Sequence, residues 1–227
     1  SYMLYPYQRT GVDFLKAHHG ALLADSVGLG KTLQTLTACH EMPEARNILV
    51  FCPAILKHQW LAELAKFYPD TTGTVIEGTQ AQRIKQWGGD QRFTIANYEL
   101  LLRDFTVIAS RERDVVIADE STRISNPRAK QSKAIKKIPA KCRYALSGTP
   151  YNNKPDDIWN VMDWLEPGVL GSWWSFMQEY CIRNHWNAVV GYRNLDMLKE
   201  KIAPYMIRRT KEEVLTELPD IVTTEVP

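Results

Sequence analysis

Short apolar runs alternate along the first two thirds of the chain with segments whose apolar positions recur every three or four residues. Several of the runs are apolar on both faces, which is typical of strands buried between two layers of helices. Between them, Trp60, Leu61 and Leu64 stand at helical spacing. The alternation predicts an α/β fold in which a mostly parallel, doubly wound sheet carries helices on both faces.

The expected elements can be placed on the chain from this pattern. The strands are expected at Ala21–Ala24, Ile48–Cys52, Thr74–Glu77, Phe93–Ala96, Val115–Ala118 and Tyr144–Ser147. The helices between them are expected at Lys31–His40, Ala54–Phe67, Gln80–Trp87, Tyr98–Asp104 and Ala129–Ile138. In a fold of this kind, ligands bind beyond the carboxyl ends of the strands.

The pattern changes after Pro150, where only helical periodicity is visible. Helices are expected at Asp156–Leu165, Trp173–Tyr180 and Leu195–Ile202. We therefore divide the chain into a nucleotide-binding core at 1–150 and a small helical appendage at 151–227. The appendage is rich in aromatic residues, which we expect to be mainly core: Trp159, Trp164, Trp173, Trp174, Phe176, Tyr180 and Trp186.

Composition narrows the class of protein. The 227 residues are 44% hydrophobic and 24% charged, which is ordinary for a globular domain and enough for one sizeable core. No apolar run is long enough to span a membrane, and the first residues lack a secretory leader, so we expect no membrane partner and an intracellular location. That location would be the cytoplasm of a bacterium or virus-infected cell, or the nucleus of a eukaryote. The four cysteines lack zinc-ligand spacing and are expected to be buried thiols.

The net charge of +2 does not by itself indicate a polyanionic partner. One local feature is more informative, because the stretch from Arg128 to Arg143 contains seven basic residues and no acidic one. Such a stretch is either a solvated helix face or a surface that contacts a phosphate backbone, and the sequence leaves both interpretations open.

A glycine-rich loop lies between the strand expected at 21–24 and the helix expected at 31–40. Its glycines allow backbone N–H groups to point inward around phosphate oxygens, and the helix N-terminus adds partial positive charge. Lys31 would reach the β- and γ-phosphates, while the Thr32 hydroxyl would coordinate Mg²⁺. Asp25 occupies the position where the strict P-loop pattern has glycine, so a turn that only caps the helix is the alternative. The expected phosphate contacts are Gly28, Leu29, Gly30, Lys31 and Thr32.

An acid pair, Asp119 and Glu120, closes the apolar strand expected at 115–118. Carboxylates at that end of a strand lie where the sheet binds its ligand. We expect Asp119 to hold Mg²⁺ together with Thr32, and Glu120 to position or deprotonate the attacking water. The catalytic residues expected are therefore Lys31 and Glu120.

The glycine-rich loop and the acid pair occur together in a known family. In these features the chain resembles the Swi/Snf family of superfamily-two helicase-like ATPases. The resemblance rests on motifs in the family's order: 4–11 (an adenine-recognising Q motif), 25–34 (motif I), 50–53 with Lys57, Gln59 and Trp60 (motif Ia), 95–98, 119–122 (motif II), 146–150 (motif III) and 206–219. It implies a RecA-like lobe that binds ATP and Mg²⁺, with Tyr7 and Gln8 beside the adenine. It also accounts for Asp25, since the family's motif I begins with Asp.

The resemblance further implies that the full-length protein is a DNA-dependent ATPase that translocates along double-stranded DNA or remodels its complexes. Contacts would be mostly to phosphate, with little sequence specificity. A second RecA-like lobe would supply arginine fingers, and because the chain ends soon after Pro219 we expect the isolated lobe to bind ATP with little turnover. The residues expected to face DNA are Pro53, Lys57, Asn97, Tyr98, Ser147, Gly148 and Thr149.

Two departures from the family pattern keep alternatives open. Ser26 stands where Glu is usual, and Thr122 stands where motif II usually ends in His, so hydrolysis is expected to be slow or differently coupled. A nucleotide-gated nucleic-acid-binding module without productive hydrolysis is one alternative function. The lobe of a superfamily-two RNA helicase is another.

Overall fold

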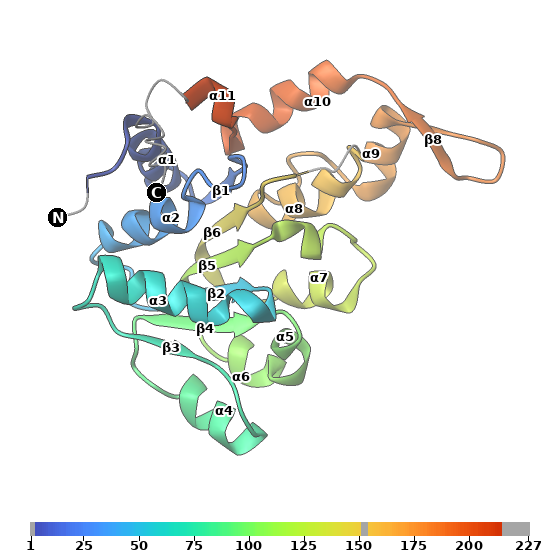
Figure 1. The fold of residues 1–227 in the computed structure, drawn as a ribbon. Coiled ribbons are helices and arrows are strands. Elements are labelled where there is room, and N and C mark those ends of the chain that lie inside the picture. Colours follow the sequence, from blue (N-terminus) through green and yellow to red (C-terminus); the bar gives the residue numbers. More distant parts are fainter. Residues whose placement is uncertain (1–2, 151–153, 215–227) are drawn as a thin grey trace, which may run out of the picture.

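A parallel sheet of seven strands forms the centre of the computed structural model, which describes residues 3–150 and 154–214 (Figure 1). The strands are β1 (Gly20–Leu23), β2 (Ile48–Cys52), β3 (Gly73–Val75), β4 (Phe93–Asn97), β5 (Arg113–Asp119), β6 (Ala140–Leu146) and β9 (Met206–Ile207). Their order is β3-β4-β2-β5-β6-β1-β9, and every pair is parallel. All carboxyl ends therefore meet at one edge of the sheet.

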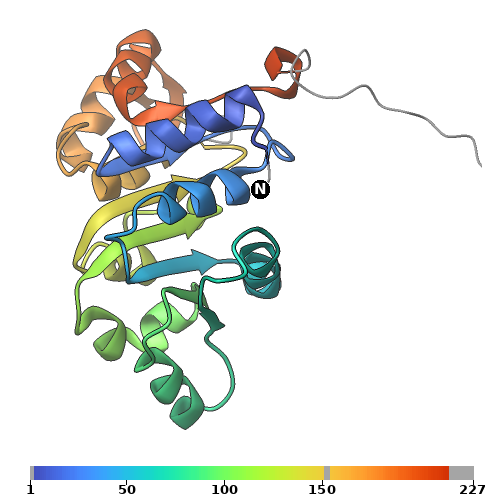
Figure 2. The same ribbon diagram turned by 90° about the vertical axis from the view of Figure 1, so that its left-hand side faces the viewer.

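Helices cover both faces of the sheet, as Figure 2 shows in side view. Neighbouring strand residues separate into two hydrophobic cores, with Leu22 on one face and Leu23 on the other. One face is covered by α1 (Pro6–Ala17), α2 (Lys31–His40) and α3 (Lys57–Phe67), the last preceded by a 3-10 turn at Ala54–Leu56. The core on the other face includes residues of α4 (Gln80–Trp87), α5 (Leu100–Arg103), α6 (Phe105–Ala109), α7 (Lys130–Ile135), α8 (Asp157–Leu165), α9 (Trp173–Tyr180) and α10 (Leu195–Ile202).

The structure confirms the expected α/β class and every expected strand and helix, with small shifts at the ends. It adds five features that the pattern did not predict. These are helix α1, helix α6, the edge strand β9, the short helix α11 (Lys211–Val214) and a hairpin of β7 (Cys181–Arg183) and β8 (Val189–Tyr192). The appendage is thus helical with one projecting hairpin.

Most of the aromatic residues in the appendage lie in the core, as expected. Trp159, Trp164, Phe176 and Tyr180 are at most 8% exposed. Trp174 and Trp186 depart from the expectation, because they are 68% and 77% exposed. The division at residue 150 stays a prediction, although β9 joins the main sheet from beyond that boundary. Among the residues described, no helix is both long and apolar enough to cross a membrane.

Candidate nucleotide and nucleic-acid site

The glycine-rich loop connects β1 to α2, as the sequence predicts. Gly28 and Gly30 adopt φ angles of 92° and 75°, which are in the left-handed region that favours glycine. A Cβ on Gly30 would also lie 2.6 Å from Nε2 of Gln8. The ammonium of Lys31 turns back into the loop and donates to the carbonyl oxygens of Asp25 at 2.8 Å and Ser26 at 3.4 Å. The loop therefore holds a cation where a phosphate group would be bound.

Lys31 also lies within the electrostatic reach of the acid pair. Burial lowers the pKa of its ammonium, while the charges of Glu120, Asp25 and Asp119 act in the opposite direction. The structure thus brings together the two sites that the sequence separates by almost ninety residues. This convergence is what a triphosphate and its metal require.

Asp119, at the end of β5, is 7% exposed and is fixed by three hydrogen bonds. Trp60 Nε1 donates to its Oδ2 at 2.8 Å, and the Tyr98 hydroxyl donates to its carbonyl oxygen at 2.7 Å. The backbone N–H of Glu120 donates to its Oδ1 at 2.9 Å. Burial raises the pKa of the Asp119 carboxyl, and the Trp60 bond partly offsets that rise.

Glu120 follows at a sharp turn in the chain, with φ 51° and ψ 56°. A left-handed conformation is costly for a residue with a Cβ, by about 1 kcal/mol or more, and such conformations cluster at functional sites. Burial and the neighbouring charge of Asp119 raise the pKa of the Glu120 carboxyl, while Lys31 lowers it. A carboxylate with a raised pKa is better suited to accept a proton from water.

Arg209 explains the aspartate in the loop, and it was not among the expected site residues. Its Nε donates to Oδ1 of Asp25 at 2.9 Å and its Nη2 to Oδ2 at 2.5 Å, while Nη2 also reaches Oε1 of Gln34 at 2.9 Å. Asp25 is fully buried, so its charge needs this partner. The sequence feature that could have indicated such a cationic partner is the position of Asp25, an acid between apolar strand residues and the loop.

The segment that follows Arg209 covers the outer side of the loop. Tyr7, Leu29 and Val214 form a small buried cluster, and a Cβ on Gly28 would lie 3.4 Å from Cε of Lys211. The Tyr7 ring packs beneath the guanidinium of Arg209 at 5.4 Å. Tyr7 therefore supports the loop from within the cluster. The part of the expected 206–219 motif after Val214 lies outside the described residues.

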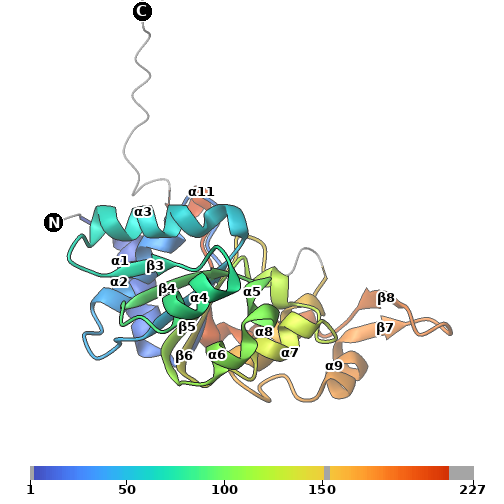
Figure 3. The same cartoon turned by 90° about the horizontal axis from the view of Figure 1, so that it is seen from below.

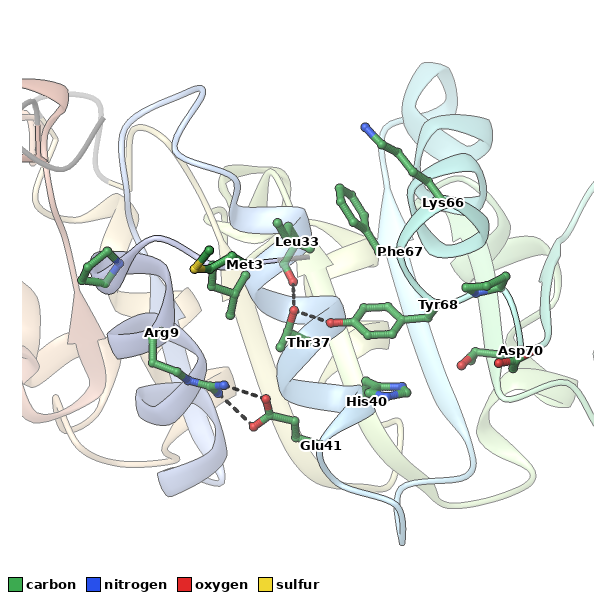
Figure 4. A pocket seen from close by; sticks show the side chains of 14 residues that line it. Met3, Arg9, Leu33, Thr37, His40, Glu41, Lys66, Phe67, Tyr68 and Asp70 are labelled. Carbon is green, nitrogen blue, oxygen red and sulfur yellow. Dashed lines mark hydrogen bonds and ion pairs between the residues drawn. The ribbon is translucent and has the colours of Figure 1, made fainter. Parts of the chain in front are cut away.

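Gln8 lies against the loop at Leu29 and Gly30. Its Nε2 donates to the carbonyl oxygen of Leu29 at 3.4 Å, and its Oε1 accepts from the backbone N–H of Tyr5 at 3.1 Å. A pocket between α1, α2 and the end of α3 opens nearby (Figure 4). Its wall includes Leu33, the residue after Thr32, and an ion pair between Arg9 and Glu41.

The residues expected to hold magnesium fit that ion by their chemistry. Asp119 offers a carboxylate and Thr32 a hydroxyl, both of which are hard oxygen ligands. Residues 3–150 and 154–214 contain no group of three His, Cys, Asp or Glu side chains arranged to hold a metal. Mg²⁺ bound to a nucleotide needs no such cage, because it keeps several waters and binds phosphate oxygens.

The residues expected to face DNA all follow the carboxyl ends of strands, at the same edge as the phosphate loop. Pro53 follows β2, Asn97 ends β4, and the 147–149 turn follows β6. Thr149 is exposed, while Pro53 and Asn97 are partly exposed. Asn97 donates to a carboxylate oxygen of Glu99 at 2.6 Å.

Three residues expected to face DNA have side chains that bind partners within the fold. Tyr98 is 1% exposed and uses its hydroxyl on Asp119, so its side chain is not available to a phosphate. Ser147 is fully buried, and its Oγ accepts from the backbone N–H of Thr149. The Lys57 ammonium donates to the carbonyl oxygen of Ile76 at 3.0 Å and lies 3.9 Å from Glu77. These side chains brace the edge of the sheet.

Gly148 places the turn after β6 directly against the phosphate loop. A Cβ at this position would lie 2.8 Å from Cγ2 of Val27 and 3.8 Å from Nζ of Lys31. The turn in motif III, expected to face DNA, is therefore in contact with the loop expected to bind phosphate.

The basic stretch expected as either a solvated face or a phosphate contact is partly neutralised. Lys136 pairs with Asp163 at 2.5 Å, and Lys141 pairs with Asp114 at 2.7 Å. These pairings favour a structural role for part of the stretch.

Fold and site together define a P-loop nucleotide-binding lobe with a RecA-like fold. Residues 7–226 match the SNF2-related domain, and the chain belongs to this family. Its structure resembles the Sulfolobus solfataricus SWI2/SNF2 ATPase core in complex with dsDNA, with a TM-score of 0.84 and 34% identity. That match covers 96% of this chain and 47% of the other.

Curated relatives support the same assignment. The chain is 30% identical to TATA-binding protein-associated factor MOT1 of Saccharomyces cerevisiae, over 94% of this chain and 13% of that protein. It is also 30% identical to the DNA annealing helicase and endonuclease ZRANB3 of Homo sapiens, over 99% of this chain and 22% of that protein. The putative ATP-dependent helicase/translocase YwqA of Bacillus subtilis shares 30% identity over 96% of this chain and 25% of its own length. The chain therefore spans a quarter or less of these relatives.

Proposed function

We propose that this lobe binds Mg·ATP and drives movement of the full-length protein along double-stranded DNA. The observation that carries the proposal is that the phosphate loop after β1 and the acid pair at the end of β5 lie at one edge of the parallel sheet, where burial lowers the pKa of Lys31 and both carboxylates act to raise it. Those three residue types, at the carboxyl edge of a parallel sheet, suit a nucleotide triphosphate.

Within this proposal each side chain has a separate task. The loop amides and Lys31 would hold the phosphates, and Thr32 and Asp119 would hold Mg²⁺, which would supply positive charge beside the phosphate oxygens. Glu120 takes a proton from the attacking water. The hydrogen bond from Gln8 to the loop carbonyl of Leu29 supports adenine recognition beside the loop.

The structure also suggests how nucleotide and DNA binding would be coupled. Trp60 belongs to the helix that follows the Pro53 loop, and Tyr98 follows the Asn97 strand end, yet both donate hydrogen bonds to Asp119. A shift of Asp119 would therefore be transmitted through these hydrogen bonds to the two loops that are proposed to contact DNA phosphates. Contacts from Pro53, Asn97, Gly148 and Thr149 would carry little sequence information, and affinity would fall steeply with salt.

A second RecA-like lobe would complete the ATP site with arginine fingers. The solved SWI2/SNF2 core is about twice as long as the matched region, which supports this expectation. Because DNA and ATP would be the ligands, we propose an intracellular site of action.

The proposal is tested by Glu120→Gln in the full-length protein, with phosphate release measured at saturating duplex DNA. We expect DNA-stimulated turnover to be abolished while Mg·ATP binding persists, whereas Lys31→Ala should weaken Mg·ATP binding itself. An unchanged phenotype for Glu120→Gln would favour the nucleotide-gated binding module. Stronger stimulation by single-stranded RNA than by duplex DNA would favour the RNA helicase.

A further inference from the structure

The hairpin of β7 and β8 is a feature that the proposed nucleotide and phosphate contacts do not use. It projects from the body beside α9 (Figures 1 and 3). The tip carries Trp186, which is 77% exposed and stacks at a tilt on His185, with ring centroids 4.3 Å apart. A tryptophan held outside the core at the end of a projecting hairpin needs an explanation, because exposure of so large an apolar ring is unfavourable in water.

The tip is held in one shape by the chain itself. Oδ1 of Asn184 accepts from the backbone N–H groups of Trp186 and Ala188, both at 3.0 Å. Asn187 has φ 63°, and its side chain accepts from Nη1 of Arg183 at 2.9 Å. The indole is therefore presented on a closed turn, so little conformational entropy remains to be lost when it binds a ligand.

The root of the hairpin is fixed to the start of α8. The Tyr192 hydroxyl donates to Oδ1 of Asp156 at 2.5 Å, and Asp156 lies shortly after the turn that follows β6. Arg193 and Asn194 bind carbonyl oxygens at the end of α9, the latter reaching Glu179 at 2.9 Å. The hairpin thus extends from the edge where the proposed DNA contacts lie.

Charge decides which class of ligand fits. From Tyr180 to Leu195 the chain has no acidic residue, and it has Arg183, His185 and Arg193 together with three asparagines. An aromatic ring pair flanked by basic and amide groups is the combination that binds nucleobases by stacking while attracting the phosphate backbone. A protein partner with an apolar surface would not require the absence of acidic residues.

We propose that the hairpin stacks Trp186 on a nucleobase at a break in the duplex, such as a fork junction, and so directs the motor to branched DNA. An intact duplex hides its base faces between neighbouring pairs, so the ring can stack only where pairing ends. This inference rests on the proposed DNA binding and deepens it by naming the preferred DNA structure.

The test compares affinities of the full-length protein for a blunt duplex and for a forked duplex with the same paired length, by fluorescence anisotropy. The wild type should bind the fork more tightly. Trp186→Ala should lose about tenfold in fork affinity, the scale of one aromatic stacking contact, and keep its affinity for the blunt duplex. Trp186→Phe should retain most of the preference because it keeps a ring.

Trp174→Ala is the matched control, because Trp174 is 68% exposed on α9 and lies outside the acid-free stretch. An equal fork preference in the wild type and Trp186→Ala overturns the inference, and so does an equal loss in Trp174→Ala. If binding to the blunt duplex is unchanged, either result contradicts only the role of the hairpin and not the proposed motor function. Conversely, fork binding that depends on Trp186 without any duplex binding would support the hairpin and contradict duplex tracking.

Discussion

The indole nitrogen of Trp60 donates a 2.8 Å hydrogen bond to Oδ2 of Asp119 and so joins α3 to the end of β5. Both partners are buried, at 1% and 7% exposure. The bond fixes one carboxylate oxygen of the residue proposed to hold Mg²⁺, and it attaches that residue to the helix after the Pro53 loop. Trp60 is thus a positioning residue for the proposed metal site.

Trp60→Phe should weaken Mg·ATP binding by about tenfold, since a hydrogen bond to a charged buried group contributes about 1.5–3 kcal/mol. It should also change the pH profile. The Trp60 bond lowers the pKa of Asp119 against the effect of burial, so its removal raises that pKa further. Because the ionised carboxylate binds the metal, activity should then be lost at a higher pH as the solution is acidified. The kcat/KM of the full-length ATPase measured against pH checks this.

Trp87→Phe is the control for that experiment. Trp87 also donates its indole N–H to a buried aspartate, Oδ2 of Asp104 at 2.9 Å, but away from the nucleotide site. It should lower stability by a similar amount and leave the acidic limb of the pH profile in place. A shift of equal size in both variants would show that Trp60 acts only through stability.

The Arg209–Asp25 ion pair leads to a second prediction, about stability. Arg209→Gln leaves the fully buried carboxylate of Asp25 without its cation. Such a change typically lowers the free energy of unfolding by about 3–5 kcal/mol. Asp25→Asn combined with Arg209→Gln should cost much less than the sum of the single changes. Urea unfolding of the four proteins measures this coupling.

Arg9→Gln provides the comparison on the surface. Arg9 binds Glu41 through two nitrogen atoms, but its side chain is 41% exposed. Loss of this ion pair should lower the free energy of unfolding by about 1 kcal/mol or less. Equal losses for Arg9→Gln and Arg209→Gln would contradict the role assigned to burial.

The sheet could be predicted from the sequence, and the two halves of the proposed nucleotide site are visible in it, because both depend on local patterns. Buried strands appear as apolar runs, and the phosphate loop needs its glycines and Lys31 in fixed order. Arg209 escaped prediction because its partner Asp25 lies 184 residues away and no local pattern joins them. The two-residue strand β9 is too short to show alternation. Tyr98 and Ser147 lie at the expected carboxyl edge of the sheet, but their side chains point inward. That direction depends on tertiary packing, which no local pattern shows.

Gly148 allows a third prediction, about communication between the turn after β6 and the phosphate loop. Gly148→Ala would place a methyl group 2.8 Å from Cγ2 of Val27, so one of the two segments must shift. We expect DNA stimulation of ATP hydrolysis to fall by several fold in the full-length protein, with a smaller change in basal turnover. Val27→Ala removes the contacting methyl groups and should restore stimulation when combined with Gly148→Ala. Failure of the double variant to recover would mean that the turn acts by another route.

The Glu41 carboxylate gives the last prediction, about acid stability. Hydrogen bonds from Arg9, aided by Lys16, lower the pKa of Glu41 from 4.5 to about 2. A folded-state pKa below the unfolded value stabilises the fold above the unfolded pKa, and this stabilisation is lost as the pH falls toward the folded value. Glu41→Gln should therefore lower the free energy of unfolding by about 1 kcal/mol near neutral pH, after allowance for partial solvent exposure.

The effect of Glu41→Gln should shrink as the pH is lowered from about 5 toward 2, because the wild-type carboxylate becomes protonated in both states over that range. Urea unfolding at several pH values measures the difference between the two proteins. Glu63→Gln is the control, since Glu63 is partly exposed on α3 and accepts only a 3.2 Å bond from Gln59 among the hydrogen bonds described for it. A difference that stays constant from neutral pH to acid would contradict the assigned ion pair, because an uncharged contact does not titrate.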